Sequence, residues 1–73
     1  MVFFFAKDAS ELQLETRFDP STRLYTVVRR QSDGTVFSEE VLGEDACRQV
    51  LRSIEQGLVD DGWRRSRPPM MMG

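Results

Sequence analysis

The sequence predicts a small α+β domain: an antiparallel β-meander of three or four strands, followed by one C-terminal α-helix packed on one face of the sheet. Three observations predict this fold. Residues 11–18 alternate polar and apolar side chains with the two-residue period of a strand. Asp33-Gly34 separates two runs rich in β-branched and aromatic residues, as in a hairpin. From Glu44 onward the apolar period becomes that of a helix.

The meander strands are expected at residues 11–18, 23–30 and 35–42. Between the first two, residues 19–22 (Asp-Pro-Ser-Thr) supply turn chemistry, because proline presets φ and the short polar side chains bond nearby backbone amides. Residues 2–6 are expected to add a fourth strand before the meander, with residues 7–10 as the connection.

The helix is expected to bury a stripe of apolar side chains against the sheet. The stripe consists of Cys47, Val50, Leu51, Ile54 and Leu58. Gly62 is expected to stop the helix, and Gly57 to bend or fray its last turn. Residues 1–63 are therefore predicted as one domain, and residues 64–73, with two prolines and clustered arginines, as a flexible tail.

Composition excludes some forms of stabilisation. The chain has 73 residues, a single cysteine and no histidine, so one chain cannot assemble a disulfide framework or a Cys/His zinc site. A core in a domain this small rarely supplies more than about 3–5 kcal/mol of stability. A second subunit is therefore an expected source of further stabilisation.

The protein is expected to be cytoplasmic, with no membrane partner. Residues 2–6 are apolar but lack a basic leader and are too short for a signal-peptide core or a membrane span. The net charge is −2, and most of the excess negative charge falls in residues 38–63. An acidic body disfavours sequence-independent binding to nucleic acid, although a local basic patch is still compatible with the sequence.

The two later strands carry apolar residues at both odd and even positions, and therefore on both faces of the sheet. One helix can cover only one of these faces. Exposed together, such side chains form a patch of the kind that marks an interaction site. We therefore expect a protein partner, first of all a second copy, and a homodimer contact made by Tyr25, Val27, Phe37 and Val41. The alternative is that these groups lie half-exposed at the domain rim, as single apolar residues often do.

Nucleic-acid binding is the alternative function. Its candidate contacts are Arg23, Arg29, Trp63, Arg64, Arg65 and Arg67. Three-stranded sheets followed by a helix bind DNA in the arm-binding domains of tyrosine recombinases and in plant ethylene-response factors, but no motif of either family occurs in this chain. The sequence favours a simpler interpretation, in which arginines and glutamates pair on a solvated face and Trp63 folds back onto the core.

We expect no catalytic residue, metal or cofactor, and thus a non-enzymatic protein. Cys47 lies on the apolar stripe with no histidine to act as a base, so it is expected to be a small core residue. Three acidic doublets, Glu39-Glu40, Glu44-Asp45 and Asp60-Asp61, lack the ligand spacing of a calcium loop. They are expected to be solvated charge.

The stretch from Tyr25 to Glu55 resembles, in its pattern of hairpin, acidic strand end and helix, small uncharacterised bacterial domains built of a β-meander and a helix. The resemblance implies the same fold. It carries no functional residue over to this chain.

Overall fold

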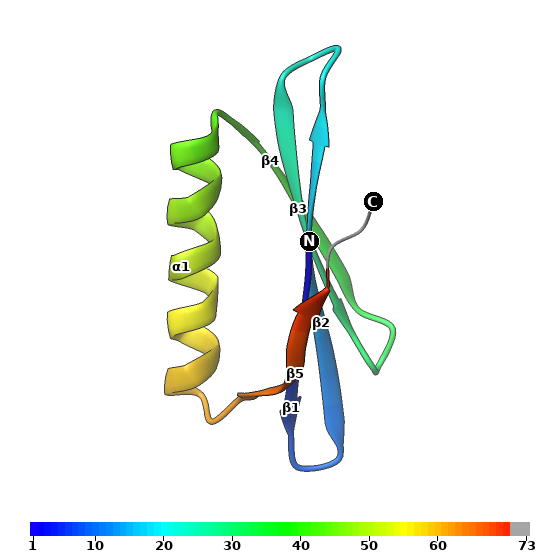
Figure 1. The fold of residues 1–73 in the computed structure, drawn as a ribbon. Coiled ribbons are helices and arrows are strands. Elements are labelled where there is room, and N and C mark those ends of the chain that lie inside the picture. Colours follow the sequence, from blue (N-terminus) through cyan, green and yellow to red (C-terminus); the bar gives the residue numbers. More distant parts are fainter. Residues whose placement is uncertain (71–73) are drawn as a thin grey trace.

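The computed structural model describes residues 1–70 and shows a five-stranded antiparallel sheet with one helix lying along one of its faces (Figure 1). The elements in chain order are β1 (Val2–Lys7), β2 (Ser10–Asp19), β3 (Leu24–Gln31), β4 (Val36–Leu42), α1 (Glu44–Asp60) and β5 (Arg64–Met70). The strands are arranged in the order β4-β3-β2-β1-β5.

The four-stranded meander is confirmed, including the strand expected at residues 2–6. The prediction that the helix is the C-terminal element was wrong. After α1 the chain returns to the sheet as β5 and pairs with β1 (Figure 1). Residues 64–70, which the sequence assigned to the tail 64–73, therefore belong to the sheet; residues 71–73 lie outside the described part of the chain.

Tail-like composition is compatible with β5 because this strand is at the edge of the sheet. An edge strand needs backbone donors on one side only, so prolines are tolerated there. Pro68 and Pro69 fall within β5, and its pairing with β1 is interrupted by two register shifts, between Val2 and Phe4 and between Phe4 and Phe5. Irregular pairing of this kind leaves no periodic signal in the sequence.

Directly opposed residues of neighbouring strands lie on the same face of the sheet. The face toward α1, the helix face, carries Phe3, Phe5, Leu12, Leu14, Tyr25, Val27, Arg29, Phe37, Glu39 and Val41. The other face, the open face, carries Phe4, Gln13, Glu15, Val28, Arg30, Val36, Ser38 and Glu40.

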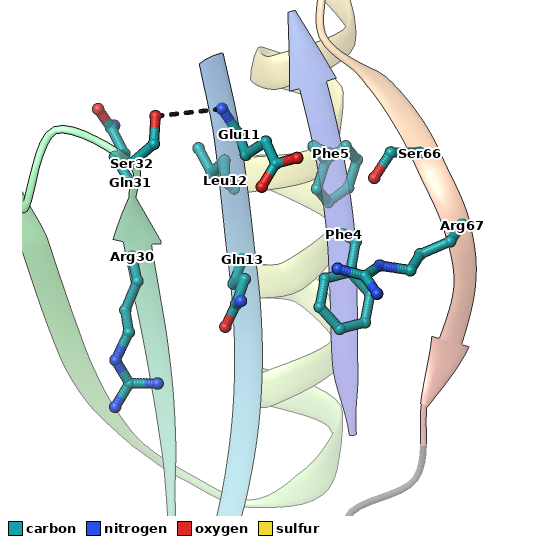
Figure 2. Close-up of a pocket in the computed structure, with 10 residues that line it drawn as sticks. All are labelled: Phe4, Phe5, Glu11, Leu12, Gln13, Arg30, Gln31, Ser32, Ser66 and Arg67. Carbon is teal, nitrogen blue, oxygen red and sulfur yellow. Dashed lines mark hydrogen bonds between the residues drawn. The ribbon is translucent and has the colours of Figure 1, made fainter. Parts of the chain in front are cut away.

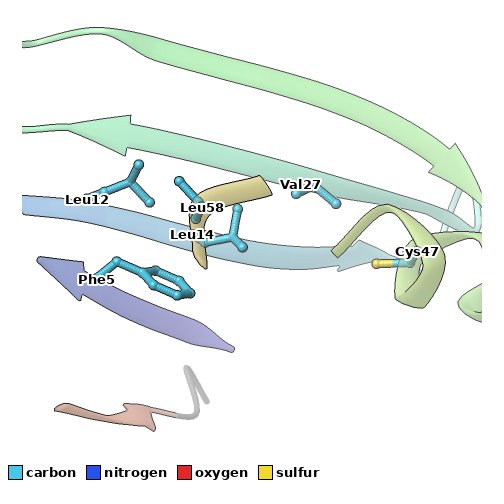
Figure 3. Packing of buried hydrophobic residues seen from close by; sticks show 6 residues of the cluster. All are labelled: Phe5, Leu12, Leu14, Val27, Cys47 and Leu58. Atoms are coloured by element: carbon cyan, nitrogen blue, oxygen red, sulfur yellow. The ribbon is translucent and has the colours of Figure 1, made fainter. Parts of the chain in front are cut away.

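The hydrophobic core lies between α1 and the helix face, as Figure 3 shows. Its buried cluster consists of Phe5, Leu12, Leu14, Val27, Cys47 and Leu58. Partly buried side chains pack around this cluster, Trp63 among them, as the sequence favoured. Cys47 is a buried core residue, and burial raises the pKa of its thiol.

The helix ends where the sequence predicted, in a turn that also joins it to β5. Gly62 adopts φ of 95°, a conformation that favours glycine, and the Trp63 N–H donates to the Leu58 carbonyl oxygen at 2.9 Å. This six-residue closure, with apolar side chains at both of its ends, is the Schellman arrangement. The helix continues through Gly57 without interruption. The turn thus directs the chain back toward the sheet.

Candidate functional site

The outer side of β4 is the candidate functional site. Within residues 1–70 no strand pairs with this side, and β4 contains no proline. We call the segment Val36–Leu42 the β4 edge. All its side chains except Val41 are exposed, and three of them are large and apolar: Val36, Phe37 and Leu42, the last 71% exposed. An edge of this kind is a template for pairing with another strand.

The backbone groups of the β4 edge can be assigned from two hydrogen bonds. The Gln31 N–H donates to the Thr35 carbonyl at 2.9 Å, whereas the Ser32 N–H donates in the opposite direction, to Glu11 of β2, at 2.9 Å. In an antiparallel pair this direction alternates from residue to residue. Every second residue, beginning with Thr35, therefore directs its backbone N–H and C=O toward β3. The residues that direct N–H and C=O away from the sheet are Val36, Ser38, Glu40 and Leu42.

On the helix face beside the β4 edge lies Arg29 of β3, which has no ion-pair partner within residues 1–70. The Arg29 guanidinium lies over the Phe37 ring, 4.9 Å from its centroid, which is a cation–π geometry. Arg29 makes no ion pair within residues 1–70, and its Nε is buried without a hydrogen-bond acceptor. Beside it is a hollow of about 380 Å³, lined by Val27, Arg29, Phe37, Ser38, Glu39 and Ile54.

The opposite edge of the sheet is less suited to pairing. In β5, Pro68 and Pro69 have no N–H to donate. Arg65 is turned toward the helix, where its Nε and Nη2 donate to a Glu55 carboxylate oxygen at 3.1 and 2.8 Å. Arg67 lies over the Phe4 ring, 3.9 Å from its centroid. The two edges of the sheet therefore differ in their capacity to bind a strand.

The open face contains a buried carboxylate. Glu15 is only 3% exposed although no helix covers this face. It accepts hydrogen bonds from Arg17 Nε at 3.1 Å and Arg30 Nη1 at 3.0 Å. Burial alone would raise the pKa of Glu15, but the hydrogen bonds and positive charges of Arg17 and Arg30 outweigh it and hold the pKa below its ordinary value.

Glu15→Gln is expected to lower the free energy of unfolding at pH 7 by about 1.5–3 kcal/mol, because the amide loses the negative charge and one of the two oxygens that accept from Arg17 and Arg30. A depressed folded-state pKa stabilises the fold above the unfolded value of 4.5, and this stabilisation is lost as pH falls through the folded pKa. The variant should therefore lose less stability on acidification than the wild type. Urea titrations between pH 7 and pH 3 measure both effects. Glu11→Gln, an exposed site on the same face of β2, is the matched control, and an equal loss there would contradict the role of Glu15.

A shallow hollow of about 150 Å³ lies on the same face (Figure 2). Across it, Arg30, Gln13, Phe4 and Arg67 come from four neighbouring strands and form one row. Both arginines in the row are engaged, one with Glu15 and the other with the Phe4 ring. Both arginines of the row therefore have partners within the chain, and the row by itself does not indicate a ligand.

The four residues predicted as a homodimer contact all lie on the helix face, but their exposure differs. Val27 is 3% exposed and belongs to the core, and Tyr25 and Val41 are partly buried against it. Phe37 is 57% exposed. Two of the four, Phe37 and Val41, lie in β4, so the β4 edge retains part of the predicted contact.

The residues predicted for nucleic-acid contact are spread over the molecule. Arg23 lies in the turn before β3, and Arg29 is on the helix face. Trp63 packs on the core. Arg64 and Arg67 are opposite Ala6 and Phe4 of β1, whereas Arg65 bonds α1. The structure does not bring these six side chains together on one surface.

Residues 1–70 contain neither a candidate metal site nor a candidate membrane-spanning helix. No group of three or more potential metal ligands occurs among them. No helix formed by these residues has the length and apolar character that a membrane crossing needs.

No family model, curated protein or solved structure matches this chain. The candidate site therefore depends on geometry alone. Sequence reasoning missed the burial of Glu15 and the outward direction of the Ser38 backbone groups, because both depend on strand register. The one signal for the β4 edge was the regular, proline-free strand pattern of residues 35–42.

Proposed function

We propose that this protein is a non-catalytic protein-interaction module that forms a homodimer by pairing its β4 edge with the same edge of a second copy. The observation that carries the proposal is the β4 edge itself: a regular strand without proline, exposed at every position except Val41, with outward backbone groups and exposed apolar side chains. Main-chain hydrogen bonds supply affinity in strand addition, and side chains supply specificity.

The energetic reason for dimerisation is the small size of the domain. Full burial of a large apolar side chain is worth about 1.5–3 kcal/mol, comparable with the whole stability expected of a single small core. Val36 and Phe37 are each more than half exposed in the single chain. Partial burial of both at a dimer contact would add substantially to the stability of the folded state.

The difference between the two edges favours a closed dimer. Because β5 contains Pro68 and Pro69, and Arg65 and Arg67 contact its own chain, it is a poor acceptor for β4 of another copy. Head-to-tail pairing of β4 with β5 would build an open filament, whereas pairing of β4 with β4 is symmetric and stops at two copies.

Ser38→Pro is the direct test. Because the N–H of Ser38 is directed away from the sheet, proline there removes a donor for the second copy and leaves the β3–β4 bonds intact. We expect a dimeric wild type and a monomeric Ser38→Pro with an unchanged far-UV circular dichroism spectrum. Light scattering from about 10 µM to about 1 mM measures the mass, since short interfaces are at the weak end of the range.

Ser38→Ala is the matched control, because it keeps the N–H and should remain dimeric. A wild type that is monomeric throughout this range would overturn the proposed dimer. A dimeric wild type together with an equally dimeric, folded Ser38→Pro would show that the contact lies elsewhere on the molecule.

Nucleic-acid binding stays a prediction with less support, since its six candidate residues do not share a surface. Retention of the wild type on DNA or RNA that weakens steeply with salt would favour it, because phosphate contacts release counterions. Arg64→Ala, at an exposed arginine with no ion pair within residues 1–70, should then reduce retention.

A further inference from the structure

We infer that the two-fold axis of this dimer passes at Ser38, so that Arg29 of each copy pairs with Glu39 of the partner subunit across the Phe37 ring. The inference rests on the proposed function and adds the register of the contact and the charge pair that selects it. It follows from three constraints: the direction of the backbone groups, the position of the acidic residues, and the unpaired Arg29.

The backbone limits the possible registers. Val36, Ser38, Glu40 and Leu42 direct their groups outward, and two edges can exchange hydrogen bonds only where one of these residues faces another of them. The outward residues all have even numbers, so the numbers of two residues that face each other across a two-fold axis add up to an even number. The axis therefore passes at a residue and not between two residues. It also places both helices on the same side of the joined sheet.

Charge then removes two of the remaining registers. An axis at Glu39 would place the two Glu39 carboxylates opposite each other, and an axis at Glu40 would do the same for Glu40. Like charges directly opposed across a strand pair are destabilising. An axis at Phe37 would limit the pairing within β4 to Val36–Ser38, because Glu39 and Glu40 would face Thr35 and Gly34 of the partner subunit.

An axis at Ser38 satisfies both constraints. It pairs β4 from Val36 to Glu40, with Phe37 opposite the partner's Glu39 and Val36 opposite the partner's Glu40. Arg29 is opposite Phe37 within its own chain, so Arg29, Phe37 and the partner's Glu39 form one row on the helix face. By symmetry the same row occurs twice.

The geometry of Arg29 suits this row. Its guanidinium already lies over the Phe37 ring and thus extends across β4 toward the edge. Two strand spacings, about 10 Å between Cα atoms, separate it from the partner's Glu39, a distance that the two long side chains span together. Neither Arg29 nor Glu39 has an ion-pair partner within residues 1–70, and both line the same hollow. Arg30, in contrast, is already engaged with Glu15.

Charge reversal tests the pair. Arg29→Glu would set two glutamates against each other in both rows, and Glu39→Arg would set two arginines against each other. We expect each variant alone to raise the Kd of the homodimer at least about tenfold. Mixed together, the two variants should form a heterodimer with a Kd near that of the wild type, because both rows then contain opposite charges. Sedimentation equilibrium of the separate and mixed samples measures this.

A disulfide tests the register without relying on charge. With the axis at Ser38, the two Ser38 Cα atoms face each other at about 5.5 Å, within the range for a disulfide. Ser38→Cys should therefore form a covalent dimer under mild oxidation. Glu40→Cys, which lies off the axis, should not, and neither should the wild type, whose Cys47 is buried.

The outcomes separate the two proposals. A monomeric wild type overturns the proposed function and the register with it. A dimeric wild type in which Glu40→Cys crosslinks in place of Ser38→Cys overturns the register alone, as does a mixture of the two charge variants that fails to associate. Crosslinking of Ser38→Cys still supports the register should Arg29→Glu fail to fold.

Discussion

Val27→Asp is expected to unfold the protein at room temperature. Val27 is 3% exposed in the core cluster, between β2 and β4 and beneath α1. The variant loses the apolar burial, about 1.5–3 kcal/mol, and adds a carboxylate with no partner in an apolar site. The sum exceeds the 3–5 kcal/mol or so that a core of this size supplies. Far-UV circular dichroism and a urea titration measure the loss.

Phe37→Asp is the matched comparison, because it makes the same kind of change on the same face of the sheet. Since the Phe37 side chain is 57% exposed, this variant should fold and should lose the dimer. Its stability should differ by less than about 1 kcal/mol from that of the wild type measured at concentrations where the wild type is monomeric. If both variants remained folded with equal stability, the placement of Val27 beneath α1 would be contradicted.

Removal of residues 64–73 is expected to cause the second large effect: loss of most of the stable fold and aggregation of the remainder. Without β5, the ladder to β1 is gone and Arg65 and Arg67 no longer cover the aromatic rings of β1. Strand β1, with the sequence VFFFAK, then becomes an exposed edge. Short apolar β-segments without proline are typical sites of aggregation. Thermal unfolding and light scattering of the truncated chain measure both effects.

Arg65→Ala combined with Arg67→Ala in the full chain is the control for this truncation. It removes the three cation–π contacts of these arginines, worth about 0.5–1 kcal/mol each at exposed sites, and the ion pair of Arg65 with Glu55, but keeps the strand. We expect this variant to remain folded and free of aggregates. A truncated chain as stable as the wild type would show that β5 contributes nothing to the sheet.

The sequence predicted the elements whose signals are local. The alternation of residues 11–18, the Asp33-Gly34 turn and the helical period after Glu44 each depend on near neighbours in the chain, and each element formed where expected. Strand β5 could not be predicted in this way, since its pairing depends on contact with a strand about sixty positions earlier. Its prolines and arginines are equally typical of a tail.

The candidate site was predicted only in part. The alternation of side chains along the strands indicated Tyr25, Val27, Phe37 and Val41 as apolar strand residues. The face that the helix covers is decided by tertiary packing, which the alternation does not reveal. That packing buries Val27 and leaves Phe37 exposed. The adjacent Arg29 and Arg30 illustrate the same limit. Arg29 lies on the helix face, where its Nε has no hydrogen-bond acceptor within residues 1–70, whereas Arg30 donates a hydrogen bond to Glu15 on the open face.

The pairing of β1 with β5 has a consequence for synthesis of the protein. A ribosome releases β1 early, but its covering strand is completed only when Met70 has emerged. During that interval the nascent chain presents three consecutive phenylalanines on an unprotected strand. The sheet therefore cannot cover β1 on this side until residues 64–70 have been synthesised, and until then β1 is its exposed edge.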